Sequence, residues 1–163
     1  MLVIDTSALI SLAVGDALEP ALDAFDIVTT ESVTQELEAT ADYDDRHGKA
    51  AHATLEMADA LTIVDVQSRE FETSRIDAGE ASCVAATREH NADFLVTDDF
   101  RALPELQELL AVEVVLSPIV LRALVQRGRL SADQAETSFE EISDGRDWLG
   151  ASIYRYAREL FEE

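Results

Sequence analysis

The chain has 163 residues, 47% of them hydrophobic, which is enough for one domain with a sizeable core. Its formal net charge is -22, and it has no basic stretch like those of most nucleic-acid-binding proteins. It has no run of eighteen apolar residues and no signal peptide at its opening MLVIDTSALI, so we expect a cytoplasmic protein without a membrane span.

The cationic residues are almost all arginines, since Lys49 is the only lysine. Many acidic residues with almost no lysine predict adaptation to high salt, as in a halophilic archaeon, because salt screens self-repulsion. An acidic surface that binds a partner is the alternative. Cys83 is the only cysteine, which excludes an internal disulfide and a zinc framework. We expect it to be a small buried residue in a helix.

Short apolar runs alternate with helical segments along the first two thirds of the chain. Runs that predict strands lie at residues 2–4, 26–30, 61–66, 93–97 and 112–116. Helices are expected at residues 6–15, 16–25, 32–42, 44–60, 77–91 and 99–111. Thr6 or Ser7 would cap the first of these helices, and Gly15 would end it.

From Ser117 onward no strand is evident, and helices are expected at residues 117–130, 131–142 and 148–163. Strands that alternate with helices predict an α/β fold, with a parallel sheet between layers of helices. We therefore expect a single domain over residues 1–163. Its α/β core would span residues 1–115, and a helical C-terminal part would span residues 116–163.

Acidic residues follow several of the predicted strands. Asp5 ends the first strand, Asp98 and Asp99 follow the fourth, and Glu36 and Glu80 lie in the helices after the second and third. In parallel sheets, ligands bind at the carboxyl ends of the strands, so these side chains would meet at one edge if strands one and four are neighbours.

A cluster of carboxylates stays ionised only when positive charge offsets it. Mg²⁺ or Mn²⁺ is the economical source, because these ions favour carboxylate and water oxygens and no histidine accompanies the acids. The chemistry implied is phosphoryl transfer, in which a metal ion activates water and stabilises charge on the phosphate. Since the chain has 34 acidic residues, solvated surface acids are the alternative interpretation.

Four segments in this order, VIDTSALI, VTQEL, DAGEASCVAA and LVTDDF, resemble the PIN-domain family. Its best-known small members are the VapC toxins of toxin–antitoxin pairs, and the resemblance covers about residues 1–115. It implies a five-stranded parallel sheet flanked by helices and a Mg²⁺- or Mn²⁺-dependent endoribonuclease that hydrolyses RNA phosphodiester bonds. It also implies an antitoxin protein as a candidate partner, and a homodimer.

The resemblance also implies roles for individual residues. The four positions that match the acids of the family are Asp5, Glu36, Glu80 and Asp99, with Glu80 standing where an aspartate is usual. The expected metal ligands are Asp5, Glu80, Asp98 and Asp99.

Ser7, Thr97 and Arg101 are the expected substrate-binding residues. The alternatives are helix capping for Ser7, and a surface ion pair for Arg101 as for Arg75. We expect Trp148, the only tryptophan, to pack among the terminal helices.

Two other functions remain as alternatives. A non-catalytic PIN module that binds nucleic acid or protein would keep the fold without turnover, but all four acid positions are filled. Another α/β phosphotransfer fold is disfavoured. A dehalogenase-type phosphatase needs a second aspartate where Ser7 stands, and a receiver domain needs a lysine far later than Lys49.

Overall fold

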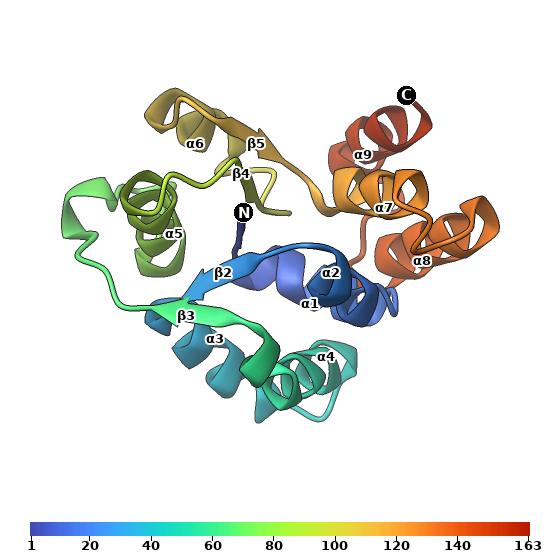
Figure 1. Cartoon of the computed structure of the whole chain (residues 1–163), viewed down its shortest axis with the longest axis horizontal. Coiled ribbons are helices and arrows are strands. Elements are labelled where there is room, and N and C mark those ends of the chain that lie inside the picture. The colour runs from blue at the N-terminus through green and yellow to red at the C-terminus, as the bar shows by residue number, and fades with distance from the viewer.

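A computed structural model describes all residues, 1–163. The centre of the fold is a five-stranded sheet (Figure 1). The strands are β1 (Leu2–Ile4), β2 (Ile27–Thr30), β3 (Thr62–Val64), β4 (Phe94–Val96) and β5 (Glu113–Val115). All neighbours pair in parallel, in the order β3-β2-β1-β4-β5. The predicted α/β class and parallel sheet are confirmed, and β1 is buried along its whole length between β2 and β4.

Nine α-helices surround the sheet. They are α1 (Thr6–Val14), α2 (Leu18–Ala24), α3 (Glu31–Ala41), α4 (Arg46–Glu56), α5 (Ala78–Glu89), α6 (Leu103–Leu109), α7 (Ser117–Gln126), α8 (Ala132–Gly145) and α9 (Ser152–Glu162). None of them is long and apolar enough to cross a membrane.

The helix α5 is the most deeply buried of these elements. Its sequence AGEASCVAATRE is rich in small side chains, so its backbone can approach β1, β2 and β4 closely. Nine of its residues are buried, among them Cys83, as expected. This packing fixes the first turn of α5 beside the carboxyl ends of the strands.

The cap of α1 differs from the prediction. Asp5, rather than Thr6 or Ser7, is the N-cap, and its side chain accepts a hydrogen bond from the Ala8 N–H. The reason is that β1 ends at Ile4, so Asp5 keeps an extended backbone while Thr6 is already helical. The first predicted acid is therefore held by the helix that it starts.

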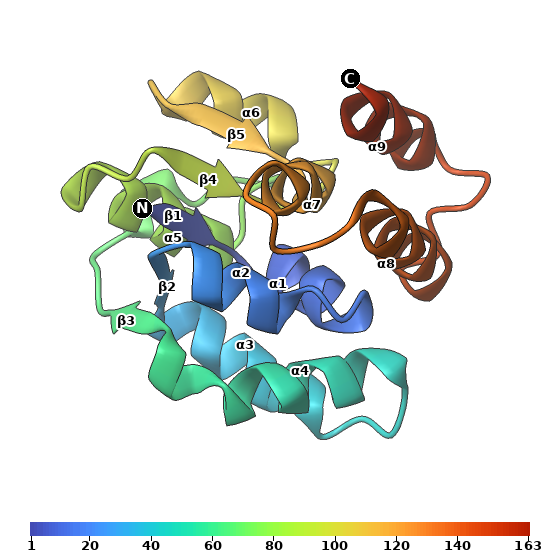
Figure 2. The ribbon, with the colours of Figure 1, turned by 45° about the vertical axis from the view of Figure 1, so that its right-hand side comes forward.

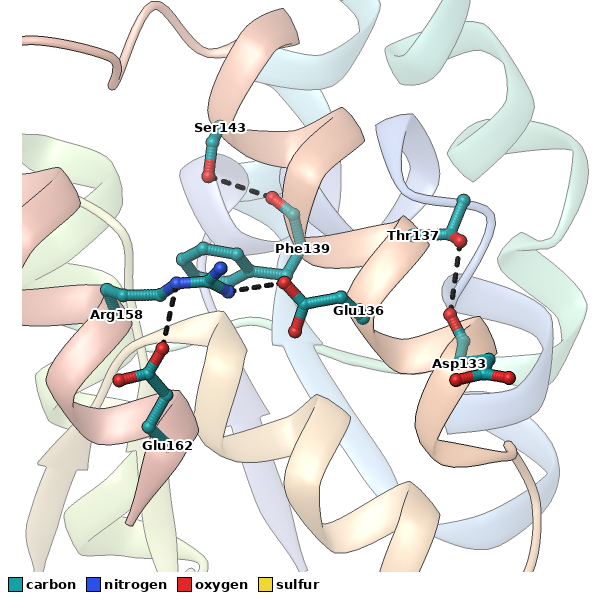
Figure 3. Close-up of polar contacts among 7 residues, drawn as sticks. All are labelled: Asp133, Glu136, Thr137, Phe139, Ser143, Arg158 and Glu162. Atoms are coloured by element: carbon teal, nitrogen blue, oxygen red, sulfur yellow. Dashed lines mark hydrogen bonds and ion pairs between the residues drawn. The ribbon is translucent and has the colours of Figure 1, made fainter.

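The C-terminal helices pack on the core through α1 and on one another. The helix α8 contacts α1 and α7, and α7 contacts α9; Figure 2 shows the three C-terminal helices gathered on one side. Arg158 of α9 pairs with Glu136 of α8 and lies over the Phe139 ring, 5.0 Å from its centroid (Figure 3). Trp148 is buried, as expected.

Candidate active site

The sheet order brings the first and last predicted acids together. Because β1 and β4 are neighbours, the ladder continues past both strands, and the Asp5 N–H donates to the Val96 carbonyl at 3.1 Å. Thr97 follows directly and donates from its N–H to the Val115 carbonyl at 2.9 Å. The segment Thr97–Asp99 therefore lies beside Asp5 at the carboxyl edge of the sheet.

Asp5 is buried, and both of its carboxylate oxygens accept hydrogen bonds. One carboxylate oxygen accepts hydrogen bonds from Ser7 Oγ at 2.7 Å and from the Ala8 N–H at 3.0 Å. The other accepts one from Thr97 Oγ1. Burial nevertheless raises the pKa of Asp5 to about 7, because desolvation outweighs these hydrogen bonds and nearby Asp98 adds repulsion. A carboxylate held this way has a high affinity for a proton or another cation.

Glu36 reaches the site from α3 and rests on the first turn of α5. Its Oε2 accepts a hydrogen bond from Thr6 Oγ1 at 2.6 Å. Its Oε1 occupies the space that a side chain at Gly79 would need, since a Cβ there would lie 1.8 Å from that oxygen. Burial raises the pKa of Glu36, and the Thr6 hydroxyl opposes the rise. The Glu36 carboxylate fits here because Gly79 has no side chain.

Glu80 combines a structural contact with a place in the cluster. It forms a capping box with Asp77, in which the Asp77 N–H donates to Glu80 Oε2 at 3.0 Å and the Glu80 N–H to Asp77 Oδ1 at 2.9 Å. Burial raises the pKa of Glu80 to about 9, and the neighbouring carboxyl groups of Asp99 and Asp77 add to the rise. Glu80 is therefore buried beside other carboxyl groups, where its charged form is disfavoured.

Asp99 is held by the turn that follows β4. Its N–H donates to Thr97 Oγ1 at 3.1 Å, and its Oδ1 accepts from the N–H groups of Arg101 and Ala102, both at 3.0 Å. Thr97 therefore contacts both Asp5 and Asp99, which ties the acids of β1 and β4 together.

Asp98 points elsewhere. Its Oδ1 accepts a hydrogen bond from the Ser117 N–H, the first residue of α7, at 2.8 Å, whereas its buried Oδ2 has no partner. Its backbone N–H donates to Ser7 Oγ at 2.9 Å. The hydrogen bonds of Asp98 therefore run to α7 and Ser7 rather than to Glu80 or Asp99.

The surface ion pairs that were the alternative for Arg101 and Arg75 do not form, so that alternative is wrong. Asp99 accepts from the backbone N–H of Arg101, whereas the Arg101 guanidinium donates to the Ser74 carbonyl at 3.2 Å. Arg101 thus spans from the turn after β4 to the loop before α5, where Arg75 is exposed.

Sequence reasoning did not assign a role to Asp77 or Gly79. The spacing Asp-x-x-Glu of Asp77 and Glu80 is a capping-box signature, so the first of these roles could have been found. Nothing in the sequence marks Gly79, because its neighbour Glu36 lies on another helix, 43 positions away.

The chemistry of these residues fits a hard divalent cation. Asp5 and Glu80 are buried, and no cationic side chain forms an ion pair with either of them. Both have raised pKa values, because burial disfavours their charged forms. The structure contains no group of three or more histidine, cysteine or acidic side chains arranged to hold a metal ion. A cation bound by the oxygens of Asp5 and Glu80 would supply the missing positive charge.

The fold agrees with a comparison against known families. A family model described as a PIN domain, DUF3368, matches residues 1–163. No curated protein and no solved structure matches the chain significantly. The match extends over the C-terminal helices as well as the α/β core. The chain therefore belongs to the PIN-domain family.

Proposed function

We propose that this protein is a Mg²⁺- or Mn²⁺-dependent endoribonuclease. PIN domains in general are nucleases that use divalent metals. The observation that carries the proposal is that Asp5, Glu36, Glu80 and Asp99, from four separate segments, gather around Thr6, Gly79 and Thr97 at one edge of the sheet.

In this proposal Asp5, Glu80 and Asp99 hold the cation, which would lower the pKa of bound water and stabilise negative charge on the phosphate. Ser7 and Thr97 hold the Asp5 carboxylate in one orientation. Glu36, fixed by Thr6, accepts a proton from the attacking water or orients it. Asp98 stays a predicted ligand through Oδ2, the oxygen that α7 does not engage.

RNA is the proposed substrate, and Arg101 is the proposed contact to its backbone. Arg101 is exposed, carries no ion pair and lies within two residues of Asp99. Ser7 and Thr97 remain predicted substrate contacts as well. A toxin role with an antitoxin partner, a homodimer and an origin in a halophile also remain predictions.

The test is cleavage of a mixed pool of structured RNAs in molar KCl with Mn²⁺ or Mg²⁺. The variants compared are Asp5→Asn and, as a matched control, Asp93→Asn. Asparagine also caps helices well, so D5N should fold. Asp93 is exposed at the opposite end of β4 and pairs only with the N-terminus.

We expect cleavage by the wild type and by D93N, a loss of at least about 100-fold in D5N, and complete loss with EDTA. Unchanged cleavage by folded D5N would refute the site. A folded wild-type protein that neither cleaves RNA nor binds Mn²⁺ would favour the non-catalytic module.

A further inference from the structure

The turn after β4, which carries Asp99, is anchored where it leaves the strand and where α6 begins. Thr97 and Leu103, at these two ends, are buried. The middle of the turn is less protected, since Phe100 is half-buried and Arg101 is exposed. The contacts of these two residues therefore bear on how firmly the Asp99 carboxylate is held.

Two contacts run outward from the middle of the turn. The Arg101 guanidinium donates to the Ser74 carbonyl in the loop before α5. The Phe100 ring packs in another direction, against the ring of Tyr156 on α9, with 5.4 Å between the ring centroids and 45° between the ring planes. Aromatic pairs at such spacings contribute stability beyond the burial of their area. The C-terminal helix α9 therefore touches the residue that directly follows Asp99.

The helix α9 is docked mainly by half-buried side chains. Ala157 is its only buried residue. It lies beside α7 (Figures 1 and 2), and Arg122 of α7 donates to the Leu160 carbonyl at 2.9 Å. The first tyrosine of α9, Tyr154, packs against Phe139 of α8, with 5.9 Å between the ring centroids. The two tyrosines of α9 thus have different aromatic partners, one on α8 and one in the turn after β4.

We propose that Tyr156 is a positioning residue, whose ring holds Phe100 and with it the turn that carries Asp99. The catalytic meaning of this role rests on the proposed function, in which Asp99 is a metal ligand. The physical reason is that Phe100 lies inside the turn. Asp99 Oδ1 accepts from the N–H groups of the two residues after it, Arg101 and Ala102, both at 3.0 Å. A Phe100 ring without its partner would loosen the peptide units that carry these donors.

The test is a double-mutant cycle of Tyr156→Ala and Phe100→Ala, with Tyr156→Phe as the variant that keeps the ring. Tyr154→Ala is the matched control, because it removes the same ring from the same helix, but that ring packs on α8. Hydrogen exchange gives the protection of the Arg101 and Ala102 amides. Calorimetry gives the Kd of Mn²⁺ without substrate, and RNA cleavage gives kcat.

We expect Y156A to speed the exchange of these two amides and to weaken Mn²⁺ binding, each by about 5-fold, the factor that corresponds to the loss of one aromatic pair. F100A should have at least the same effects, and the double variant should be no worse than F100A, because both changes remove one contact. Y156F should match the wild type within twofold. Y154A should speed the exchange of the α9 amides but leave those of the turn within twofold.

Three outcomes would overturn the proposal. One is amide protection of the turn, or Mn²⁺ affinity, unchanged in folded Y156A. Another is a double variant in which the two effects simply add. The third is an equal loss in Y154A, which would assign the effect to a general loosening of α9.

If Y156A does not fold, or if α9 detaches in it, Tyr156→Leu decides, because leucine keeps apolar bulk without the ring. Faster exchange of the turn amides in Y156L, with α9 still protected, supports the proposal. Protection equal to that of the wild type refutes it.

Failure of the proposed function would look different. A wild-type protein that binds Mn²⁺ but cleaves no RNA, with affinity and amide protection still lower in Y156A, would refute the nuclease and leave the positioning role intact. A wild-type protein that binds no Mn²⁺ would refute the metal site, and protection of the turn amides alone would then decide whether Tyr156 holds the turn.

Discussion

At the scale of single residues, the site is made of carboxylates placed where their charge is poorly solvated. Asp5 and Glu80 are 4% and 7% exposed, and burial is the main cause of the raised pKa of each. Buried acids of this kind destabilise a fold when ionised, unless a cation accompanies them. Their presence at the carboxyl edge of a parallel sheet is therefore better explained by function than by stability.

The first prediction concerns pH. The pKa of Asp5 rises from 3.8 to about 7 on folding, and that of Glu80 from 4.5 to about 9. Between these limits the folded state binds more protons than the unfolded state, so the free energy of unfolding should fall as pH rises. The slope is at most about 1.4 kcal/mol per pH unit for each group. Urea unfolding with EDTA from about pH 5 to 9 measures it.

Asp5→Asn should remove only the contribution of Asp5, which lies below about pH 7, and leave that of Glu80. Mn²⁺ should raise stability most at high pH, where the acids are ionised. A free energy of unfolding that rises steadily from about pH 5 to 9 without metal would contradict the burial of these charges.

The second prediction concerns Gly79. Alanine in place of a helical glycine normally stabilises a helix by up to about 1 kcal/mol. Here we expect Gly79→Ala to destabilise the protein and to weaken Mn²⁺ binding about 10-fold. The cause is the Cβ, which would lie 1.8 Å from Glu36 Oε1 and push that carboxylate away. Thermal unfolding and calorimetry with Mn²⁺ measure the two effects.

The double variant Gly79→Ala/Glu36→Ala is the control. With the carboxylate removed, alanine at position 79 should again be neutral or stabilising relative to Glu36→Ala alone. If the alanine destabilises both backgrounds equally, the clash with Glu36 is not its cause.

At the scale of elements, the site depends on one small-residue helix, the turn after β4 and the start of α1. The helix α5 carries Glu80 and makes room for Glu36, the turn after β4 carries Asp99, and the start of α1 carries Asp5. The loop before α5 closes onto the turn after β4 through the bond from Arg101 to Ser74. Exposed cationic groups are thereby placed next to the acids.

The third prediction concerns Arg101. If it contacts the RNA backbone, Arg101→Gln should raise KM about 5-fold and leave kcat within twofold, because one exposed phosphate contact is worth about 1 kcal/mol and is not made to the reacting atoms. Steady-state cleavage of one defined RNA at fixed salt measures both constants.

Arg155→Gln is the matched control, since it removes the same charge from an exposed position of α9. Equal effects of the two substitutions would point to the general field of the molecule and not to a contact at Arg101.

The same elements show what sequence could and could not predict. Strands such as β1 and β4 could be predicted because buried parallel strands are continuous apolar runs, and α5 because small residues recur along it. The cap of α1 was mispredicted, because Asp5, Thr6 and Ser7 are consecutive and all can cap. The direction of the Asp98 side chain could not be predicted, since it depends on the N-terminus of α7, which only the tertiary structure brings near.

At the scale of the whole molecule, the dominant feature is the large net negative charge. With a net charge of -22 on 163 residues and few ion pairs, the folded state carries strong self-repulsion at low salt. The same field repels RNA, so the unpaired arginines near the site and a bound cation would have to offset it locally. Salt weakens both kinds of repulsion, because the Debye length falls from about 10 Å at 0.1 M to about 3 Å at 1 M.

The fourth prediction is therefore that KCl stabilises the fold. Raising KCl from about 0.1 M to about 2 M should raise the free energy of unfolding by about 2 kcal/mol, or Tm by about 4–8 °C for a chain of this size.

General effects of salt on apolar burial act in the same direction, so a variant with fewer charges is needed to separate these effects from the screening of self-repulsion. The substitutions Glu38→Gln, Glu89→Gln, Glu108→Gln and Glu140→Gln change exposed residues that form no ion pair. Together they should raise Tm at low salt and reduce the response to KCl, whereas an unchanged response would show that self-repulsion is not what salt relieves.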